Sequence, residues 1–103
     1  MVKNEFGIKS IIVESTAKCY CPLGNDWYTN QFTVEFNPGE YIPDYCEMDN
    51  WIAVNINGQT MIIEAAVDKL YSYLIETYKP NDLYVESYVD DARHSTVTVC
   101  KGE

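Results

Sequence analysis

The chain has 103 residues and a formal net charge of −9, and 47% of its residues are hydrophobic. This length fits one hydrophobic core, so we expect a single domain over residues 1–103, and the apolar content excludes a disordered chain. Only seven residues are Lys or Arg, which argues against direct binding of nucleic acid or of an anionic membrane surface, because both need cationic side chains. A small molecule or another protein remains as the expected binding partner.

The first ten residues, "MVKNEFGIKS", carry charges within the first five positions and contain no long apolar run. We therefore expect neither a signal peptide nor a membrane span, and a cytoplasmic location. In that compartment thiols stay reduced. The four cysteines are then not expected to form a disulfide framework: Cys19, Cys21, Cys46 and Cys100.

The first part of the chain predicts two β-strands. Residues 7–18 are rich in β-branched side chains, and residues 28–36 ("YTNQFTVEF") alternate apolar and polar side chains with the period of a half-buried strand. The Pro38-Gly39 pair that follows predicts a type II turn, because proline fixes the first φ angle and glycine accepts the positive second one.

The middle of the chain is less regular. Residues 41–46 ("YIPDYC") predict a return strand, at an edge or a bulge, because Pro43 cannot donate to a ladder. Residues 47–60 are ambiguous. The Asn57-Gly58 pair favours a hairpin, but it also suits the loop that leads into a helix.

The clearest element is a long helix within residues 60–80. Its apolar side chains recur at helical spacing: Ile63, Val67, Leu70 and Leu74. We expect Thr60 to cap the helix and Pro80 to end it. Two strands follow, over residues 82–89 and 95–100. This order predicts an α+β fold, in which a helix covers one face of an antiparallel sheet that has four strands, with or without an extra N-terminal strand.

The stretch "CYCPLGNDWYT" (residues 19–29) places two thiols and a carboxylate just ahead of a predicted strand. A thiolate attacks electrophilic carbons such as that of a nitrile, and a nearby carboxylic acid can supply the proton that the nitrogen needs. Cys21 and Asp26, joined by a glycine-containing loop, are the candidate nucleophile and acid. The alternative is that Cys21 is a packed small hydrophobe and Asp26 starts a strand or caps a turn.

A metal site is the other chemistry that cysteines suggest. Structural zinc is bound by two ligand pairs, each with roughly two to four residues between its members. Cys19 and Cys21 are closer than that, and Cys46, His94 and Cys100 stand singly. We therefore expect no metal site. We also expect the side chains of Cys19 and Cys21 to point apart, so that they form no redox pair.

Several phrases resemble the tunnelling-fold (T-fold) superfamily of pterin- and deazaguanine-handling enzymes: "QFTVEF", "YCEMDNWIAV" and "TMIIEAAVDKL". The phrase "CPLGNDWYT" is similar to the Cys-Pro-x-Thr-Gly-x-Pro-Asp-Phe motif of the nitrile reductases of 7-cyano-7-deazaguanine, on the way to queuosine. The helix start is similar to that of dihydroneopterin aldolase. Together these resemblances span about residues 15–99. They imply a homo-oligomeric ring of subunits that join edge to edge and bind a small planar heterocycle, a 7-deazaguanine or pterin-like ring.

The resemblance implies roles for individual residues. Cys21 matches the catalytic cysteine of the reductases, and Asp26 matches their catalytic aspartate in a loop that is two residues shorter. Glu64 matches the glutamate that holds the substrate ring, since a carboxylate can accept two parallel N–H bonds; otherwise it is a surface charge at a helix start. Glu47 and Arg93 match further substrate-site residues, although Arg93 also suits a role in offsetting the two aspartates before it.

The resemblance also implies where the pocket lies and what it needs. We expect a buried Glu64 at the floor of a pocket between neighbouring subunits, with Cys21 at its mouth. The reductase stretch tied to NADPH falls at "EMDNWI", where Glu47 matches but no lysine occurs, and Ile63 stands where the reductases have histidine. The single histidine, His94, is too few for the zinc-dependent members, and the strand at residues 82–89 lacks the lysine of the aldolases.

Two hypotheses about function follow. In the first, the chain is an enzyme that forms a thioimide between Cys21 and a ring-bound nitrile, which NADPH then reduces or ammonia converts to an amidine. In the second, it is a catalytically silent oligomer that binds a ring compound or a partner protein.

Overall fold

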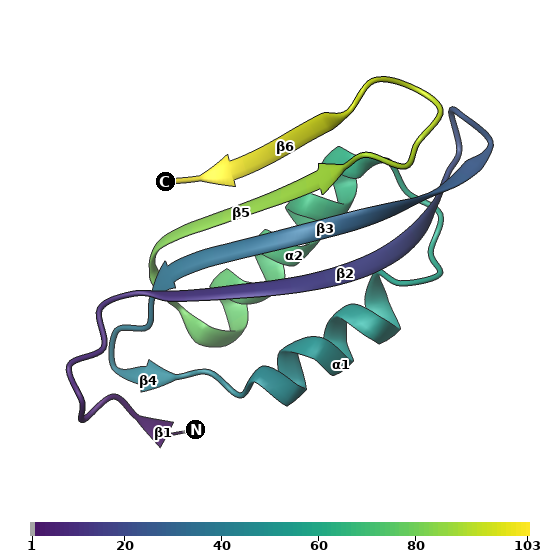
Figure 1. Ribbon diagram of the computed structural model, residues 1–103. Coiled ribbons are helices and arrows are strands. Elements are labelled where there is room, and N and C mark those ends of the chain that lie inside the picture. The colour runs from purple at the N-terminus through teal and green to yellow at the C-terminus, as the bar shows by residue number, and fades with distance from the viewer. Residues whose placement is uncertain (1) are drawn as a thin grey trace.

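The computed structural model describes residues 2–103. The elements in chain order are β1 (Val2–Lys3), β2 (Ile11–Cys21), β3 (Asp26–Asn37), β4 (Tyr41–Ile42), α1 (Tyr45–Asn55), α2 (Ile63–Tyr78), β5 (Asn81–Val89) and β6 (Val97–Gly102). The four long strands form one antiparallel sheet in the order β2-β3-β5-β6, and β1 pairs only with β4 (Figure 1). Within the described part of the chain, no helix is long and apolar enough to span a bilayer.

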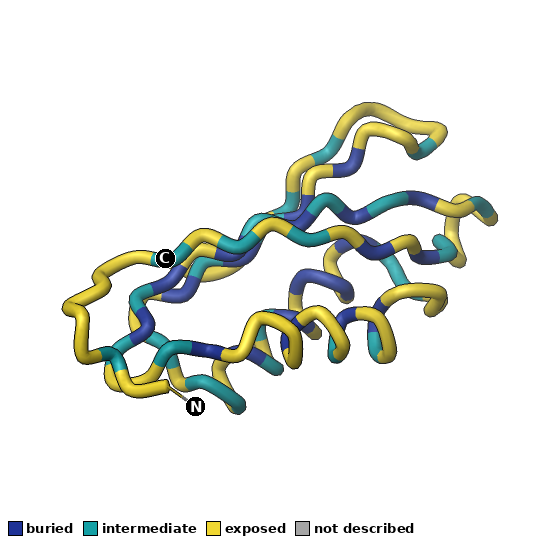
Figure 2. Tube along the Cα trace, turned by 60° about the horizontal axis from the view of Figure 1, so that its bottom comes forward, coloured by how far each residue is buried: buried dark blue, intermediate teal, exposed yellow. Residues whose placement is uncertain are grey.

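Both helices lie on one side of the four-stranded sheet and leave its other side open (Figure 2). The period-2 alternation in β3 explains this, because every second residue of that strand is buried against the helices: Tyr28, Asn30, Phe32, Val34 and Phe36. The α2 helix adds Ala66, Val67, Leu70 and Leu74 to the same core. The predicted α+β class, with one antiparallel sheet of four strands and helices on a single face, is confirmed.

The segment after Pro43 is a helix, so the strand predicted for residues 41–46 is wrong beyond the two residues of β4. The Asp44 side chain accepts a hydrogen bond from the Glu47 N–H at 3.1 Å and caps α1. Met48 and Ile52, one turn apart, are both buried in the core. An aspartate cap followed three residues later by a glutamate is a helix-start signal, which the proline and the tyrosines obscured.

The start of α2 also differs from the prediction. The capping position is Ile62, without a side-chain cap, and Thr60 does not cap. Thr60 instead forms a parallel bridge with Tyr20 of β2. The Tyr20 N–H donates to the Gln59 carbonyl at 2.9 Å, and the Met61 N–H donates to the Tyr20 carbonyl at 3.0 Å. The linker therefore runs along the outer edge of β2, and the helix begins only at Ile63, beyond the reach of a cap at Thr60.

The Asn57-Gly58 pair lies in this linker and is not a hairpin. The Asn57 side chain accepts a hydrogen bond from the Lys18 N–H at 2.9 Å, and the Gly58 N–H donates to the Lys18 carbonyl at 2.7 Å. Gly58 has a φ of 81°, a left-handed conformation that favours glycine. The second interpretation, a loop that leads into the helix, is the correct one.

Candidate active site around Cys21

The candidate nucleophile and acid meet at a hairpin. Cys21 ends β2, Asp26 begins β3, and the two residues are partners in the ladder. The loop between them closes because Asn25 adopts a φ of 52° and its N–H donates to the Cys21 carbonyl at 2.9 Å. The Gly24 N–H also donates to the Cys21 sulfur at 3.4 Å. The hairpin therefore fixes the half-buried thiol beside Asp26.

The loop between β5 and β6 (residues 90–96) is held against the start of β3. Three side-chain contacts hold it: Arg93 Nε to Asp26 Oδ2 at 2.8 Å, Thr29 N to Asp91 Oδ1 at 2.9 Å, and Gln31 Nε2 to Asp90 Oδ1 at 3.1 Å. The Arg93 and Asp26 side chains are 81% and 43% exposed, so their ion pair positions the loop more than it stabilises the fold. Partial burial opposes ionisation of Asp91, but the hydrogen bonds from Thr29 outweigh it and lower the pKa of Asp91.

Two adjoining hollows surround Cys21. The first, of about 230 Å³, is lined by residues that include Cys21, Asp26, Ile63, Arg93 and His94. The second, of about 390 Å³, shares Cys21, Ile63 and His94 and adds Glu64. Since an apolar cavity of about 150 Å³ holds a benzene molecule, each hollow has room for a planar ring. The structure therefore brings three of the other four sequence-predicted site residues, Asp26, Glu64 and Arg93, to the hollows that Cys21 lines.

Glu64 lies on the first turn of α2, on the wall of the second hollow. Because Ile62 offers no capping side chain, the first N–H groups of the helix have no side-chain partner at this wall. They favour a negative charge or a hydrogen-bond acceptor there. Glu64 is exposed in the single chain. The expectation of a buried acid is therefore not met within one subunit.

Glu47 lies away from the other predicted site residues. Its carboxylate accepts a hydrogen bond from the Tyr78 hydroxyl at 3.2 Å, and Tyr78 is the last residue of α2. Since α2 has 16 residues, it separates Glu47 from Glu64 by about 20 Å. Within one chain, Glu47 lines neither hollow.

The NADPH hypothesis depends on the same helix, and the residues present do not fit this cofactor. α1 exposes Glu47 and Asp49 and contains no Lys, Arg or His. The phosphates of NADPH need cationic or N–H donors, whereas this surface offers carboxylates.

Cys19 is a buried thiol beneath the hairpin. Its Sγ donates to the Ile56 carbonyl at 3.2 Å and accepts from Asn30 Nδ2 at 3.5 Å, and burial raises the pKa of Cys19. Cys19 and Cys21 point to the same face of β2, because residues two apart in a strand share a face. The expectation that they point apart is wrong. What separates them is burial, since Cys19 is 0% exposed and Cys21 is half-buried.

Two residues of this site were not identified from the sequence as part of it. Tyr28 borders the first hollow, and its hydroxyl donates to the Met61 carbonyl at 2.6 Å. Burial raises the pKa of Tyr28 well above its ordinary value, so it stays a neutral phenol. His94 borders both hollows. The sequence alone suggested only a role as a metal ligand for it. Across residues 2–103, no three or more His, Cys, Asp or Glu side chains cluster as a metal site would require.

The likeness of this chain to known proteins lies in its fold. No protein-family model matches the sequence, and no curated protein sequence matches it. Among solved structures, the archaeosine synthase QueF-Like in the apo form is similar, with a TM-score of 0.74 over 94% of this chain and 95% of that one. The chain has the fold of archaeosine synthase QueF-Like. The two sequences are 15% identical, so the likeness to archaeosine synthase is one of fold.

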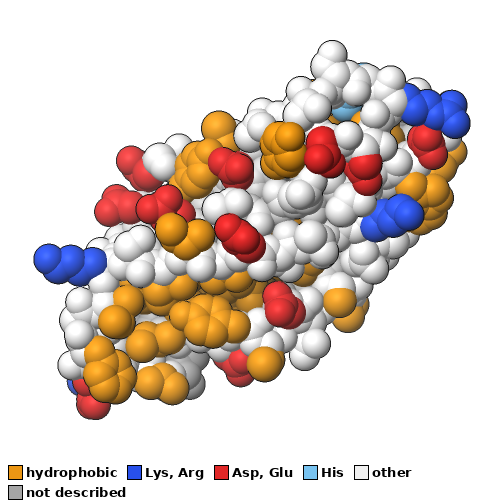
Figure 3. Space-filling model, viewed as in Figure 1, with side chains coloured by type: hydrophobic (Ala, Val, Ile, Leu, Met, Phe, Trp, Pro, Cys, Tyr) orange, Lys and Arg blue, Asp and Glu red, His pale blue; other side chains and the backbone are white. Residues whose placement is uncertain are grey.

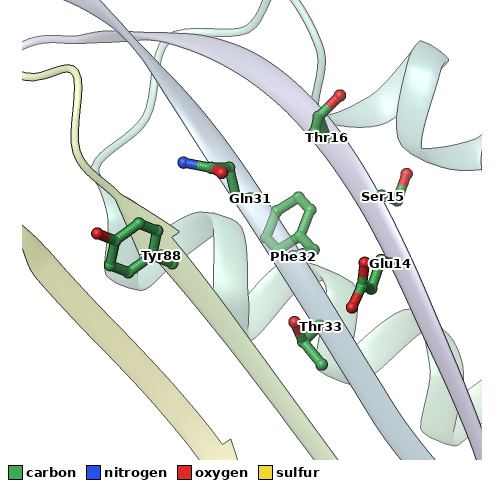
Figure 4. Close-up of a pocket in the computed structure, with 7 residues that line it drawn as sticks. All are labelled: Glu14, Ser15, Thr16, Gln31, Phe32, Thr33 and Tyr88. Carbon is green, nitrogen blue, oxygen red and sulfur yellow. The ribbon is translucent and has the colours of Figure 1, made fainter.

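A larger hollow, of about 550 Å³, lies elsewhere, on the open face of the sheet. Figure 4 shows side chains of β2, β3 and β5 around it, among them Glu14, Gln31 and Tyr88. It contains no thiol and none of the predicted site residues. The smaller hollows at Cys21 are the better candidate, because they combine a nucleophile with charged groups and apolar walls.

Proposed function

We propose that the chain is an enzyme that binds a 7-deazaguanine or pterin-like ring and forms a covalent adduct with it through Cys21. The observation that carries this proposal is the meeting of Cys21, Asp26, Glu64 and Arg93 around two adjoining hollows. These residues come from β2, β3, α2 and the loop after β5. The fold shared with an archaeosine synthase and the resemblance of "CPLGNDWYT" to the nitrile reductases support the choice of ring.

In the first step the Cys21 thiol adds to the carbon of a nitrile on the ring. A C–S bond forms, one π bond of the nitrile breaks, and the thiol proton ends on the nitrogen, which gives a thioimide. Asp26 borders the path of that proton. The Glu64 carboxylate binds the amino and N–H groups of the ring by two parallel hydrogen bonds, and so holds the nitrile toward the sulfur.

In the second step ammonia attacks the thioimide carbon. A C–N bond forms, the C–S bond breaks, and the released sulfur recovers a proton, which leaves an amidine and free Cys21. This outcome is preferred to reduction because the acidic surface of α1 does not suit NADPH.

We further propose that the enzyme is a homo-oligomeric ring, in which a second copy covers the exposed Glu64. Exposed apolar side chains near the N-terminal segment support self-association, since contiguous apolar surface marks interaction sites: Val2, Phe6, Ile8, Ile12 and Tyr41. Figure 3 shows such side chains gathered where β1, β2 and β4 lie.

The decisive experiment is intact-mass analysis of the protein after incubation with 7-cyano-7-deazaguanine. We expect a mass gain equal to one whole ligand, because addition to a nitrile expels no group. The Cys21→Ala variant should show no gain, whereas Cys46→Ala, which removes an exposed thiol elsewhere, should react normally. A folded protein that never gains the ligand mass would refute the proposal.

The silent binding oligomer remains the second candidate, because the Asp26 carboxylate is already engaged by Arg93 and by the Trp27 N–H, at 2.8 Å each. The same samples separate the two functions. Saturable binding of 7-cyano-7-deazaguanine without a mass gain would favour the binding protein.

A further inference from the structure

His94 is the only histidine of the chain, and it lines both hollows together with Cys21. The residues just before His94 attach its loop to the start of β3. Arg93 contacts Asp26 at 2.8 Å, and Asp91 accepts a hydrogen bond from the Thr29 N–H at 2.9 Å. These contacts hold the loop beside the two hollows, which share His94 and Cys21 as lining residues.

The hydrogen bond of the ring defines which nitrogen is available. His94 Nδ1 lies 2.7 Å from the Ser95 carbonyl oxygen. A carbonyl oxygen can only accept, so Nδ1 carries the hydrogen and donates it. In the neutral ring Nε2 is then an acceptor, which is the state of a general base.

We propose that His94 is a further catalytic residue, and that its Nε2 removes the proton of the Cys21 thiol and delivers it to the nitrogen of the bound nitrile. This inference rests on the proposed function. It also assigns Asp26 a different task from that expected from the sequence: as a carboxylate paired with Arg93, Asp26 accepts a hydrogen bond from the new N–H instead of supplying its proton.

The step balances within the site. The S–H bond breaks and the imidazole becomes an imidazolium, the thiolate forms the C–S bond as one π bond of the nitrile opens onto nitrogen, and the imidazolium returns its proton to that nitrogen. His94 ends neutral, and no oxidant or further reactant is needed.

The charged and titratable groups that border the same hollows come from four segments. Cys21 lies on β2, Asp26 and Tyr28 on β3, Glu64 on α2, and Arg93 on the loop of His94 itself. The His94→Gln variant differs from wild type only in this side chain. A change in the pH dependence of Cys21 labelling in that variant is therefore attributable to His94.

Thiol alkylation tests the inference without any ring ligand. Folded wild type and the His94→Gln variant are treated with iodoacetamide across pH 5–9, and labelling at Cys21 and Cys46 is measured in the same digest. Because the thiolate is the reactive form, we expect Cys21 at pH 7 to react about tenfold or more slowly in the variant. The pH profile of Cys21 labelling should also differ between the variant and wild type. Cys46, exposed on α1, is the internal control and should not change.

Adduct formation with 7-cyano-7-deazaguanine gives the second readout. His94→Gln should slow the mass gain about 100-fold while ligand affinity stays unchanged. If the variant matches wild type in both adduct rate and alkylation profile, the role of His94 is refuted and the proposed function stands. If no protein forms an adduct but Cys21 alkylation depends on His94, the proposed substrate is wrong and the Cys21–His94 pair stands.

Discussion

Beneath the Cys21 site, two fully buried polar side chains bind each other. The Ser87 hydroxyl donates to Asn30 Oδ1 at 2.8 Å, and Asn30 Nδ2 donates to the Ala17 carbonyl at 3.2 Å. Both side chains are 0% exposed. Together these contacts connect β5, β3 and β2 at the level of the core on which the hairpin rests.

Replacing Ser87 by alanine should destabilise the fold. The change leaves Asn30 Oδ1 buried without this donor, and an unpaired buried polar group costs about 1–3 kcal/mol. Thermal unfolding followed by circular dichroism should show a fall in Tm of roughly 4 °C or more. Ser72→Ala, on the exposed face of α2, is the matched control. Equal Tm values for the two variants would contradict the network.

At Glu64, the Glu64→Gln change should weaken ring binding by about tenfold or more, because a charge-assisted hydrogen bond contributes roughly 1.5–3 kcal/mol. The measurement is calorimetric titration with 7-cyano-7-deazaguanine in a Cys21→Ala background, which prevents the adduct. Glu76→Gln, a matched change on the exposed last turn of the same helix, should bind as the parent does. If both changes reduce affinity equally, the effect comes from net charge and not from a contact with Glu64.

At the scale of the elements, two aspartates attach the loop at residues 90–96 to β3. The two loop aspartates bind to β3, Asp90 through the Gln31 side chain and Asp91 through the Thr29 N–H. The ion pair at Arg93 is a third contact. These contacts keep Arg93 and His94 at the hollows. The arrangement of the site therefore depends on the stability of this loop.

This loop should respond to acid. Because the folded pKa of Asp91 is lowered, its ionised form stabilises the fold at pH values above the unfolded pKa of about 3.9. That contribution is lost as the pH falls through the lower folded value. Wild type should therefore exceed Asp91→Asn in unfolding free energy by about 0.5 kcal/mol at pH 7, after allowance for solvent screening. The difference should shrink below about pH 4. Urea titrations at several pH values measure it, and a constant difference would contradict this account.

At the scale of the whole molecule, the sheet has two outer strands. The outer edge of β2 is covered by the linker at Lys18 and Tyr20. Among residues 2–103, no strand pairs with the outer side of β6. The Glu103 N–H donates to the Leu83 carbonyl, so the odd-numbered residues of β6 pair with β5 and the Thr98 N–H points outward. An uncovered edge of this kind is where a second chain can add a strand.

Changing Thr98 to proline should therefore separate the subunits without unfolding them. Proline removes only an outward N–H, which an edge strand of a monomer tolerates. In a ring joined through β6, that N–H forms a bond between subunits. Light scattering after size exclusion should show an oligomer for wild type and for Thr98→Val, and a monomer for Thr98→Pro. A folded Thr98→Pro protein of unchanged mass would exclude β6 as the joint.

The sequence determined the features that nearby residues encode. The alternation of Phe32, Val34 and Phe36 predicted the buried face of β3. The 3.6-residue period of apolar side chains predicted α2 and its buried face. The short loop in "CPLGND" was sufficient to predict that Cys21 and Asp26 lie close together. Each of these depends on residues a few positions apart, whose spacing sets which face of a strand or helix they share.

Tertiary structure decided the rest. Whether residues 45–55 became strand or helix depended on burial of Met48 and Ile52 against the sheet, which local propensity does not specify. The Arg93–Asp26 pair joins segments far apart in the chain, and it brings His94 to a hollow that no sequence spacing connects to Cys21. Packing also sets how α1 and α2 lie against the sheet. It leaves Glu64 exposed at the start of α2 and places Glu47, on α1, beside the other end of α2.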